Sequence, residues 1–143
     1  GVGIEINRKG CFELCFIRVG GAGVWVCDRR DEVADLQKLA ARVTAAMAMP
    51  QQQPEMLGFR WPFIENDRED QSRAVALQAL RAQWQYLRSQ GCEYAVMMGA
   101  DAALWLPRAG VPGCLLPGSV AEVLQSAGHK RTLWRFLADR ASP

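Results

Sequence analysis

Residues 93–99 read EYAVMMG, a short apolar run that follows a long helical pattern and decides the fold. Glycines at 91 and 99 bound the run, which is typical of a strand covered on both faces. Upstream, four large apolar residues recur at helical spacing: Leu77, Leu80, Trp84 and Leu87. Asn66 with Glu69 predicts a cap at the start of that helix, and Gly91 predicts its end. We therefore expect a long helix packed on a sheet whose central strand lies at 93–98.

The remaining segments alternate between strand and helix patterns. Strand formers at 11–19 and 24–27, separated by a glycine-rich stretch, predict a hairpin. Asp28 or Asp31 is expected to cap the first helix, which Pro50 must end. Ser119 with Glu122 predicts a capping box, and Gly128 a break between the last two helices. The expected strands are 11–19, 24–27, 57–63, 93–98 and 114–116; the expected helices begin near 33, 66, 120 and 129, with a brief helical turn at 100–106 and a loop at 107–113.

This order predicts a single three-layer α/β/α domain over residues 11–143, with a mixed, largely parallel central sheet. Residues 1–10 form an N-terminal lead-in or a short edge strand, because Val2, Ile4 and Ile6 alternate with small or polar residues. At 143 residues the chain is long enough to bury one core.

Composition and charge bound the class of protein only loosely. A net charge of +2 and an isoelectric point near 8.4 are too mild to predict a nucleic-acid-binding or membrane-binding surface, so the charge is uninformative. No apolar run approaches the roughly 20 residues that span a bilayer, and no signal peptide is seen. The five cysteines are odd in number and lie in apolar segments, so we expect reduced core thiols in a cytoplasmic protein.

No catalytic, cofactor-binding or metal-binding residues are predicted. His129 has no nucleophile or carboxylate partner placed by the sequence, which favours a surface histidine. The glycines at 20, 21 and 23 lead into a strand rather than a helix, so a hairpin turn explains them better than a phosphate loop. Asp67, Glu69 and Asp70 are explained as carboxylates at a helix start. The missing catalytic pattern favours a binding or scaffolding domain.

Two groups of exposed side chains are candidates for binding. Arg73, Arg81 and Arg88 on the long helix, with Arg131 and Arg135 on the last, usually mark a solvated face, so direct DNA contact is the less favoured interpretation. The second group surrounds Arg60 and is a candidate protein interface, with the alternative that it closes the end of the core. Its members are Phe59, Trp61, Pro62 and Phe63.

Several of these segments together resemble the psi subunit of bacterial DNA polymerase III. The resemblance is carried, from about residue 12 onward, by LGFRWPF at 57–63, ALQAL at 76–80, VMMG at 96–99, LPGSVAEVL at 116–124 and HKRTLWRFL at 129–137. It implies a fold similar to that of uracil-DNA glycosylases, without their activity. The water-activating aspartate motif and the His-Pro-Ser stretch of the glycosylases are both missing.

The resemblance also implies partners. Psi subunits are non-catalytic adaptors that bind the chi subunit through the folded domain and so link the clamp loader to single-stranded-DNA-binding protein. An N-terminal peptide joins them to the clamp-loader subunits gamma and tau, and the resemblance assigns that contact to sequence upstream of Gly1. No cofactor is implied.

The alternative is a small α/β hydrolase or nucleotide-binding protein with its site near Asp101. This residue follows Gly99 at the carboxyl end of the predicted central strand. In open α/β sheets, ligands bind at this edge. The position of Asp101 is the only motivation for this alternative.

Overall fold

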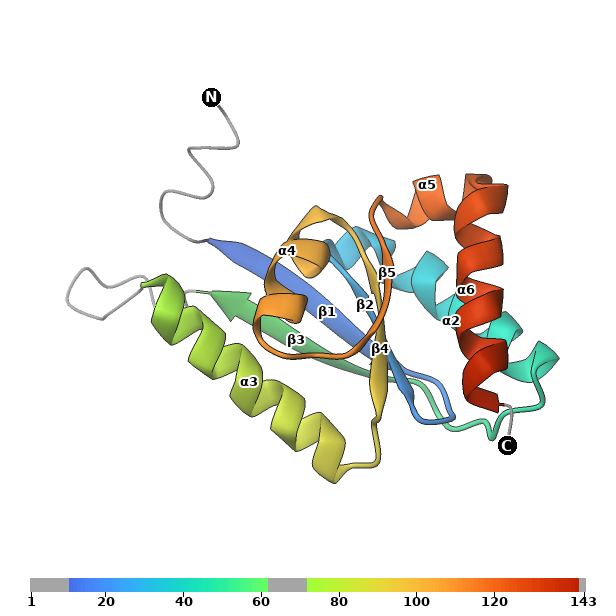
Figure 1. Cartoon of the computed structure of the whole chain (residues 1–143), viewed down its shortest axis with the longest axis horizontal. Coiled ribbons are helices and arrows are strands. Elements are labelled where there is room, and N and C mark those ends of the chain that lie inside the picture. The colour runs from blue at the N-terminus through green and yellow to red at the C-terminus, as the bar shows by residue number, and fades with distance from the viewer. Residues whose placement is uncertain (1–10, 62–71, 142–143) are drawn as a thin grey trace.

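The computed structural model describes residues 11–61 and 72–141. Strands and helices alternate along the chain after an initial hairpin (Figure 1). The strands are β1 (Phe12–Arg18), β2 (Gly23–Cys27), β3 (Glu55–Trp61), β4 (Tyr94–Met98) and β5 (Gly113–Leu116). The helices are η1 (Arg30–Glu32), α2 (Val33–Ala46), α3 (Arg73–Ser89), α4 (Ala100–Arg108), α5 (Val120–Gln125) and α6 (Ala127–Ala141).

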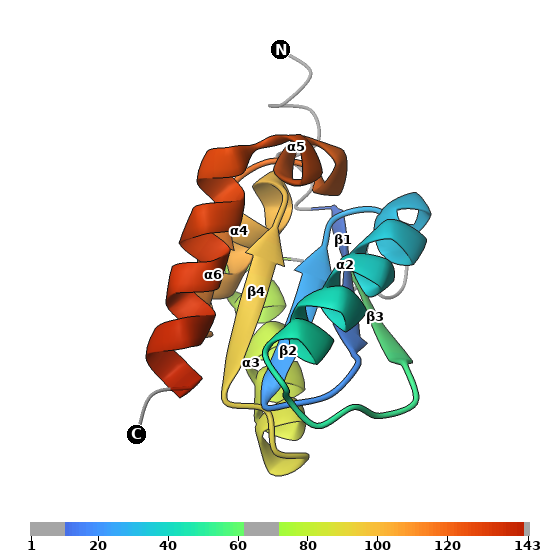
Figure 2. The same cartoon turned by 90° about the vertical axis from the view of Figure 1, so that its right-hand side faces the viewer.

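The strands form one mixed sheet of five strands in the order β3-β1-β2-β4-β5. β1 is antiparallel to both of its neighbours, whereas β2, β4 and β5 run parallel. Helices α3 and α4 lie on one face, and α2, α5 and α6 lie on the other (Figure 2). The predicted single α/β domain with helices on both faces of a mixed sheet is therefore confirmed. The strand predicted to be central is β4, and all five of its residues are buried. The middle strand of the sheet is its neighbour β2, so the prediction is wrong by one position.

The core beneath α3 and α4 is rich in aromatic residues. The phenyl ring of Phe12, in β1, stacks on Trp105 of α4 with ring centroids 4.3 Å apart, and on Phe59 of β3 at 5.6 Å. Helix α3 buries the stripe that its spacing predicts, with Leu80 and Trp84 only 1% and 4% exposed. This layer therefore ties α3 to the antiparallel half of the sheet.

The opposite core joins α2, α5 and α6 to the sheet. Trp25 of β2 lies within it, among residues of α2 that include Leu36 and of α6 that include Leu133. Tyr94 at the start of β4 makes an edge-to-face contact with Phe136, at a centroid separation of 5.3 Å. None of the helices described in residues 11–61 and 72–141 is both long and apolar enough to cross a membrane.

Two helix boundaries differ from those predicted. The expected turn at 100–106 is a full helix that includes Pro107, whose ring nitrogen cannot donate to the carbonyl one turn earlier. The break between the last two helices lies at Ser126, and Gly128 lies in the first turn of α6. Ser72 caps α3 by accepting from the Val75 N–H, at 3.3 Å. The predicted cap at Asn66 and Glu69 lies outside the described residues, as do residues 1–10.

The capping box at α5 is confirmed. The Ser119 hydroxyl accepts from the Glu122 N–H at 3.1 Å, and the Glu122 carboxylate accepts from the Ser119 N–H at 3.0 Å. The hydrogen bonds that the Glu122 carboxylate receives from Ser119, first from its backbone N–H and then from its side chain, lower the pKa of Glu122. The sequence pattern is sufficient here because both partners lie within one turn.

None of the five cysteines forms a disulfide bond with another, and four of them are buried. Cys11 is exposed, contrary to its prediction as a core thiol. Cys15 and Cys27 face each other across the β1–β2 hairpin. Burial is the main cause that raises the pKa of both thiols, that of Cys27 to about 12. This pair is therefore held in its protonated, weakly nucleophilic form.

We predict that Leu80→Ala lowers the free energy of unfolding by about 2–5 kcal/mol, because it leaves a cavity under α3. Gln85→Ala, on the exposed side of the same helix, is the control and should change it by less than about 0.5 kcal/mol. Urea unfolding followed by circular dichroism measures both. Equal losses in the two variants would contradict the placement of α3.

Candidate functional site

Asp28, at the carboxyl end of β2, holds the start of α4. Because β2 and β4 are parallel neighbours, the residues that follow them meet at one edge of the sheet. One carboxylate oxygen of Asp28 accepts from the Asp101 N–H and the other from the Ala102 N–H, both at 2.9 Å. Gly99 precedes α4 with φ +109°, and a Cβ there would overlap this carboxylate. Asp28 therefore caps α4. The predicted cap of the first helix by Asp28 or Asp31 is wrong, because neither η1 nor α2 has a side-chain cap.

This contact fills the position in which α/β proteins commonly bind an anionic ligand. A helix start offers free N–H groups and a positive dipole end to phosphate or carboxylate. Here the Asp28 carboxylate occupies the first turn of α4. Burial raises its pKa, although hydrogen bonds from the backbone at residues 100–102 act in the opposite direction.

Asp101, the residue of the predicted alternative site, lies in the first turn of α4 and is partly buried. Desolvation raises its pKa, and the negative charge of Asp28 raises it further. The two carboxyl groups thus repel each other at the edge where β2 and β4 end. A shallow open depression at this edge is lined by Glu13, Asp28 and residues 29–31, but not by Asp101.

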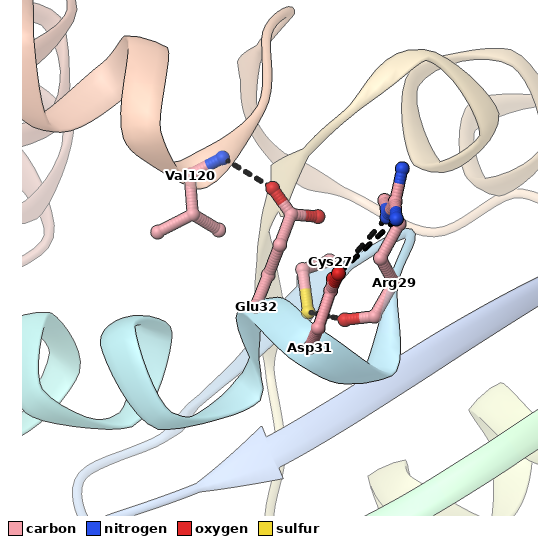
Figure 3. Close-up of polar contacts among 5 residues, drawn as sticks. All are labelled: Cys27, Arg29, Asp31, Glu32 and Val120. Atoms are coloured by element: carbon pink, nitrogen blue, oxygen red, sulfur yellow. Dashed lines mark hydrogen bonds and ion pairs between the residues drawn. The ribbon is translucent and has the colours of Figure 1, made fainter.

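The turn after β2 carries a second acidic cap, shown in Figure 3. The Glu32 carboxylate accepts from the Val120 N–H at the start of α5, at 2.9 Å. Beside it, the Arg29 guanidinium pairs with Asp31 at 3.1 Å, and the Cys27 thiol donates to the Arg29 carbonyl at 3.4 Å. Residues 28–32 therefore supply caps to the helices that follow two different strands.

The predicted protein interface is divided by the structure. Phe59 and Trp61 lie in the core beneath α3 and α4, at 2% and 7% exposure. Their rings therefore offer little contact area to a partner. Pro62 and Phe63 lie outside the described residues.

A different apolar surface lies beside these buried rings, where β3 begins and α3 ends. Met56, Leu57 and Tyr86 are 46%, 37% and 55% exposed, and together they line one pocket of about 90 Å³. We call these three residues the β3–α3 surface. The Arg18 and Glu55 side chains also line the pocket. The surface therefore combines large apolar side chains with charged groups, as the anchors of protein interfaces do.

Sequence reasoning missed the β3–α3 surface. The sequence predicts Leu57 in a strand, but it does not indicate Tyr86 as a surface residue, because a single tyrosine on a polar helix face carries no signal by itself. Tyr86 and Met56 are far apart in the sequence, so no spacing indicates that β3 and α3 meet. The other exposed large apolar side chains of the described residues, Leu115 and Trp134, belong to β5 and α6.

Of the remaining candidates for catalysis or metal binding, only His129 lies among the described residues. His129 lies in the first turn of α6, where its N–H donates to the Ser126 hydroxyl at 3.1 Å. The acidic residues 67–70 lie outside the described residues. In the part of the chain that the structure describes, no three His, Cys, Asp or Glu side chains are grouped so as to hold a metal ion.

The comparisons with known proteins found no relatives. The sequence matches no protein-family model, and neither the curated proteins nor the solved structures gave a match. What the chain does must therefore be argued from its own surfaces and from the resemblance of its motifs.

We predict that Gly99→Ala is more destabilising than Gly110→Ala. Both glycines have positive φ, +109° and +83°, so each substitution carries a backbone penalty of about 1–2 kcal/mol. Only at Gly99 would the new Cβ also meet the Asp28 carboxylate, because the space around Gly110 is open. Chemical denaturation should show a further loss of about 1–3 kcal/mol for Gly99→Ala. Equal losses of stability in the two variants would mean that the Asp28 carboxylate can move away from position 99 at no cost.

We predict that Asp101→Asn stabilises the protein increasingly as the pH rises. Because the folded pKa of Asp101 lies above its ordinary value of 3.8, ionisation of this group opposes folding. The wild type therefore loses stability, relative to the variant, as the pH rises from 3.8 through the folded pKa. Denaturation of both proteins at a series of pH values measures the difference. A difference that shrinks as the pH rises would contradict the repulsion between Asp28 and Asp101.

Proposed function

We propose that this protein is a non-catalytic adaptor that binds another protein through the β3–α3 surface. The observation that carries the proposal is that Met56, Leu57 and Tyr86 are exposed around one pocket. Scattered exposed apolar residues are ordinary, but a group of them is typical of a binding site. The pocket gives a partner's apolar side chain a place to enter, and Tyr86 is of the residue type most enriched at interface hot spots.

The partner that the motif resemblance supports is the chi subunit of DNA polymerase III. In this proposal the chain is an accessory subunit of the replicative holoenzyme and links the clamp loader, through chi, to single-stranded-DNA-binding protein. The α/β fold with helices on both faces is compatible with the resemblance but is shared by many unrelated proteins.

A hydrolase or nucleotide-binding protein with its site near Asp101 has less support. The N–H groups of Asp101 and Ala102 already donate to the Asp28 carboxylate. A phosphate at the start of α4 would have to displace this carboxylate and lie beside a second one. Both acidic groups oppose the binding of an anion.

The test is titration calorimetry of the chain with the chi subunit of the same organism. We expect a one-to-one complex for the wild type. The double variant Leu57→Ser/Tyr86→Ser removes the two apolar side chains that share the α3 face of the sheet, because Leu57 pairs with Phe16. It should raise the dissociation constant at least about 30-fold, equivalent to roughly 2 kcal/mol.

The matched control is Leu115→Ser/Trp134→Ser, which removes two exposed apolar side chains from β5 and α6. It should bind as the wild type does. Thermal melts by circular dichroism establish that both variants fold. Absence of a wild-type complex at micromolar concentrations would overturn the assignment of chi as the partner. A loss confined to the control variant would move the interface to β5 and α6.

A further inference from the structure

Helix α3 carries positive charge without compensation. Arg73, Arg81 and Arg88 all lie exposed along it, and none of its residues is acidic. At a rise of about 1.5 Å per residue, consecutive arginines of this set are roughly 10–12 Å apart along the helix axis. A fourth exposed arginine, Arg108, ends the neighbouring helix α4 on the same face of the sheet (Figure 1).

Three of these arginines gather where α3 meets α4. The Arg81 guanidinium donates to the Arg108 carbonyl at 3.4 Å, which brings the two helices together at this point. Arg73 and Arg108 line one small pocket with Leu104 and Trp105. We call Arg73, Arg81 and Arg108 the arginine furrow.

The arginines of the furrow differ in their ion pairing from Arg29 and Arg30 near the sheet edge. Arg29 pairs with Asp31 at 3.1 Å, and Arg30 pairs with Glu13 at 3.3 Å. Among the described residues, by contrast, no carboxylate forms an ion pair with an arginine of the furrow. Arg81 donates one N–H to the Arg108 carbonyl, and Arg108 donates one to the Leu104 carbonyl at 2.6 Å. Because a guanidinium carries several N–H groups, both side chains have further donors for an external anion.

The furrow offers positive charge to a ligand but almost no space for an inserted side chain. The pocket between Arg73 and Arg108 has a volume of only about 10 Å³, too small to admit an amino-acid side chain. Guanidinium groups bind phosphate oxygens in a bidentate manner, and a row of them suits a chain with a charge on every unit. An acidic peptide that also needs apolar pockets is less well matched.

We infer that the arginine furrow binds the phosphodiester backbone of a nucleic acid, independently of base sequence. This binding is separate from the β3–α3 surface and does not depend on the adaptor proposal. The affinity should be modest and electrostatic, because each phosphate contact releases bound counterions and weakens as salt rises.

Fluorescence anisotropy of the full chain with a labelled oligothymidine of roughly 20 nucleotides tests this inference. Three phosphate contacts predict that log K falls against log salt with a slope of about −2 on a single strand. The variant Arg73→Gln/Arg81→Gln/Arg108→Gln should bind at least about tenfold more weakly at low salt and lose most of this slope.

The control, Lys130→Gln/Arg131→Gln/Arg135→Gln, removes the same number of positive charges from α6. It should stay within about twofold of the wild type at the same salt. Circular dichroism melts establish that both triple variants fold. If both triple variants bind the oligonucleotide equally weakly, net charge explains the effect and the inference is wrong. It is also wrong if the wild type does not bind at low salt and micromolar concentration.

Competition identifies the source of the phosphates. Unlabelled single-stranded DNA, RNA and duplex DNA are titrated against the labelled strand, and the competitor effective at the lowest concentration is assigned as the ligand. Polyglutamate of equal charge is the discriminating competitor. If it displaces the strand as well as the oligonucleotides do, the furrow binds acidic polypeptides and the inference is wrong.

Discussion

The bond between the Asp28 carboxylate and the first turn of α4 is the constraint on which this edge of the fold depends. It requires β2 and β4 to be parallel neighbours, and it requires a residue without a Cβ at position 99. Glu32, from the same turn, closes the start of α5 in a similar way. One short segment after the middle strand therefore fixes where two later helices begin.

This arrangement turns a potential ligand site into a structural element. Parallel sheets leave helix N–H groups unsatisfied where their strands end, and enzymes use such groups to hold substrates. Here an internal carboxylate satisfies them, at the expense of burying a charge near Asp101. Exposed groups suited to binding lie elsewhere, along β3 and on the outer sides of α3 and α4. A fold that caps its own helix starts is well suited to binding through its outer surfaces.

Local signals predicted most of the fold, whereas long-range contacts could not be predicted. The hairpin, the stripe of α3 and the capping box at Ser119 are all encoded within a few residues. The Asp28 cap joins residues 73 positions apart, so no spacing indicates it. The sequence left open whether Phe59 and Trp61 form an interface or close the core, and both are buried. Which residues of β3 are buried depends on the helix that covers it, so Phe59 is enclosed while Met56 is exposed.

The paired thiols of Cys15 and Cys27 give the molecule an internal reporter. Both are buried and protonated, so an alkylating reagent reaches them only when the β1–β2 hairpin separates from α2. Exposed Cys11, just before β1, supplies a reference labelling rate within the same chain. The rate of modification at the buried pair therefore measures how often the centre of the sheet opens, without a cysteine introduced by mutation.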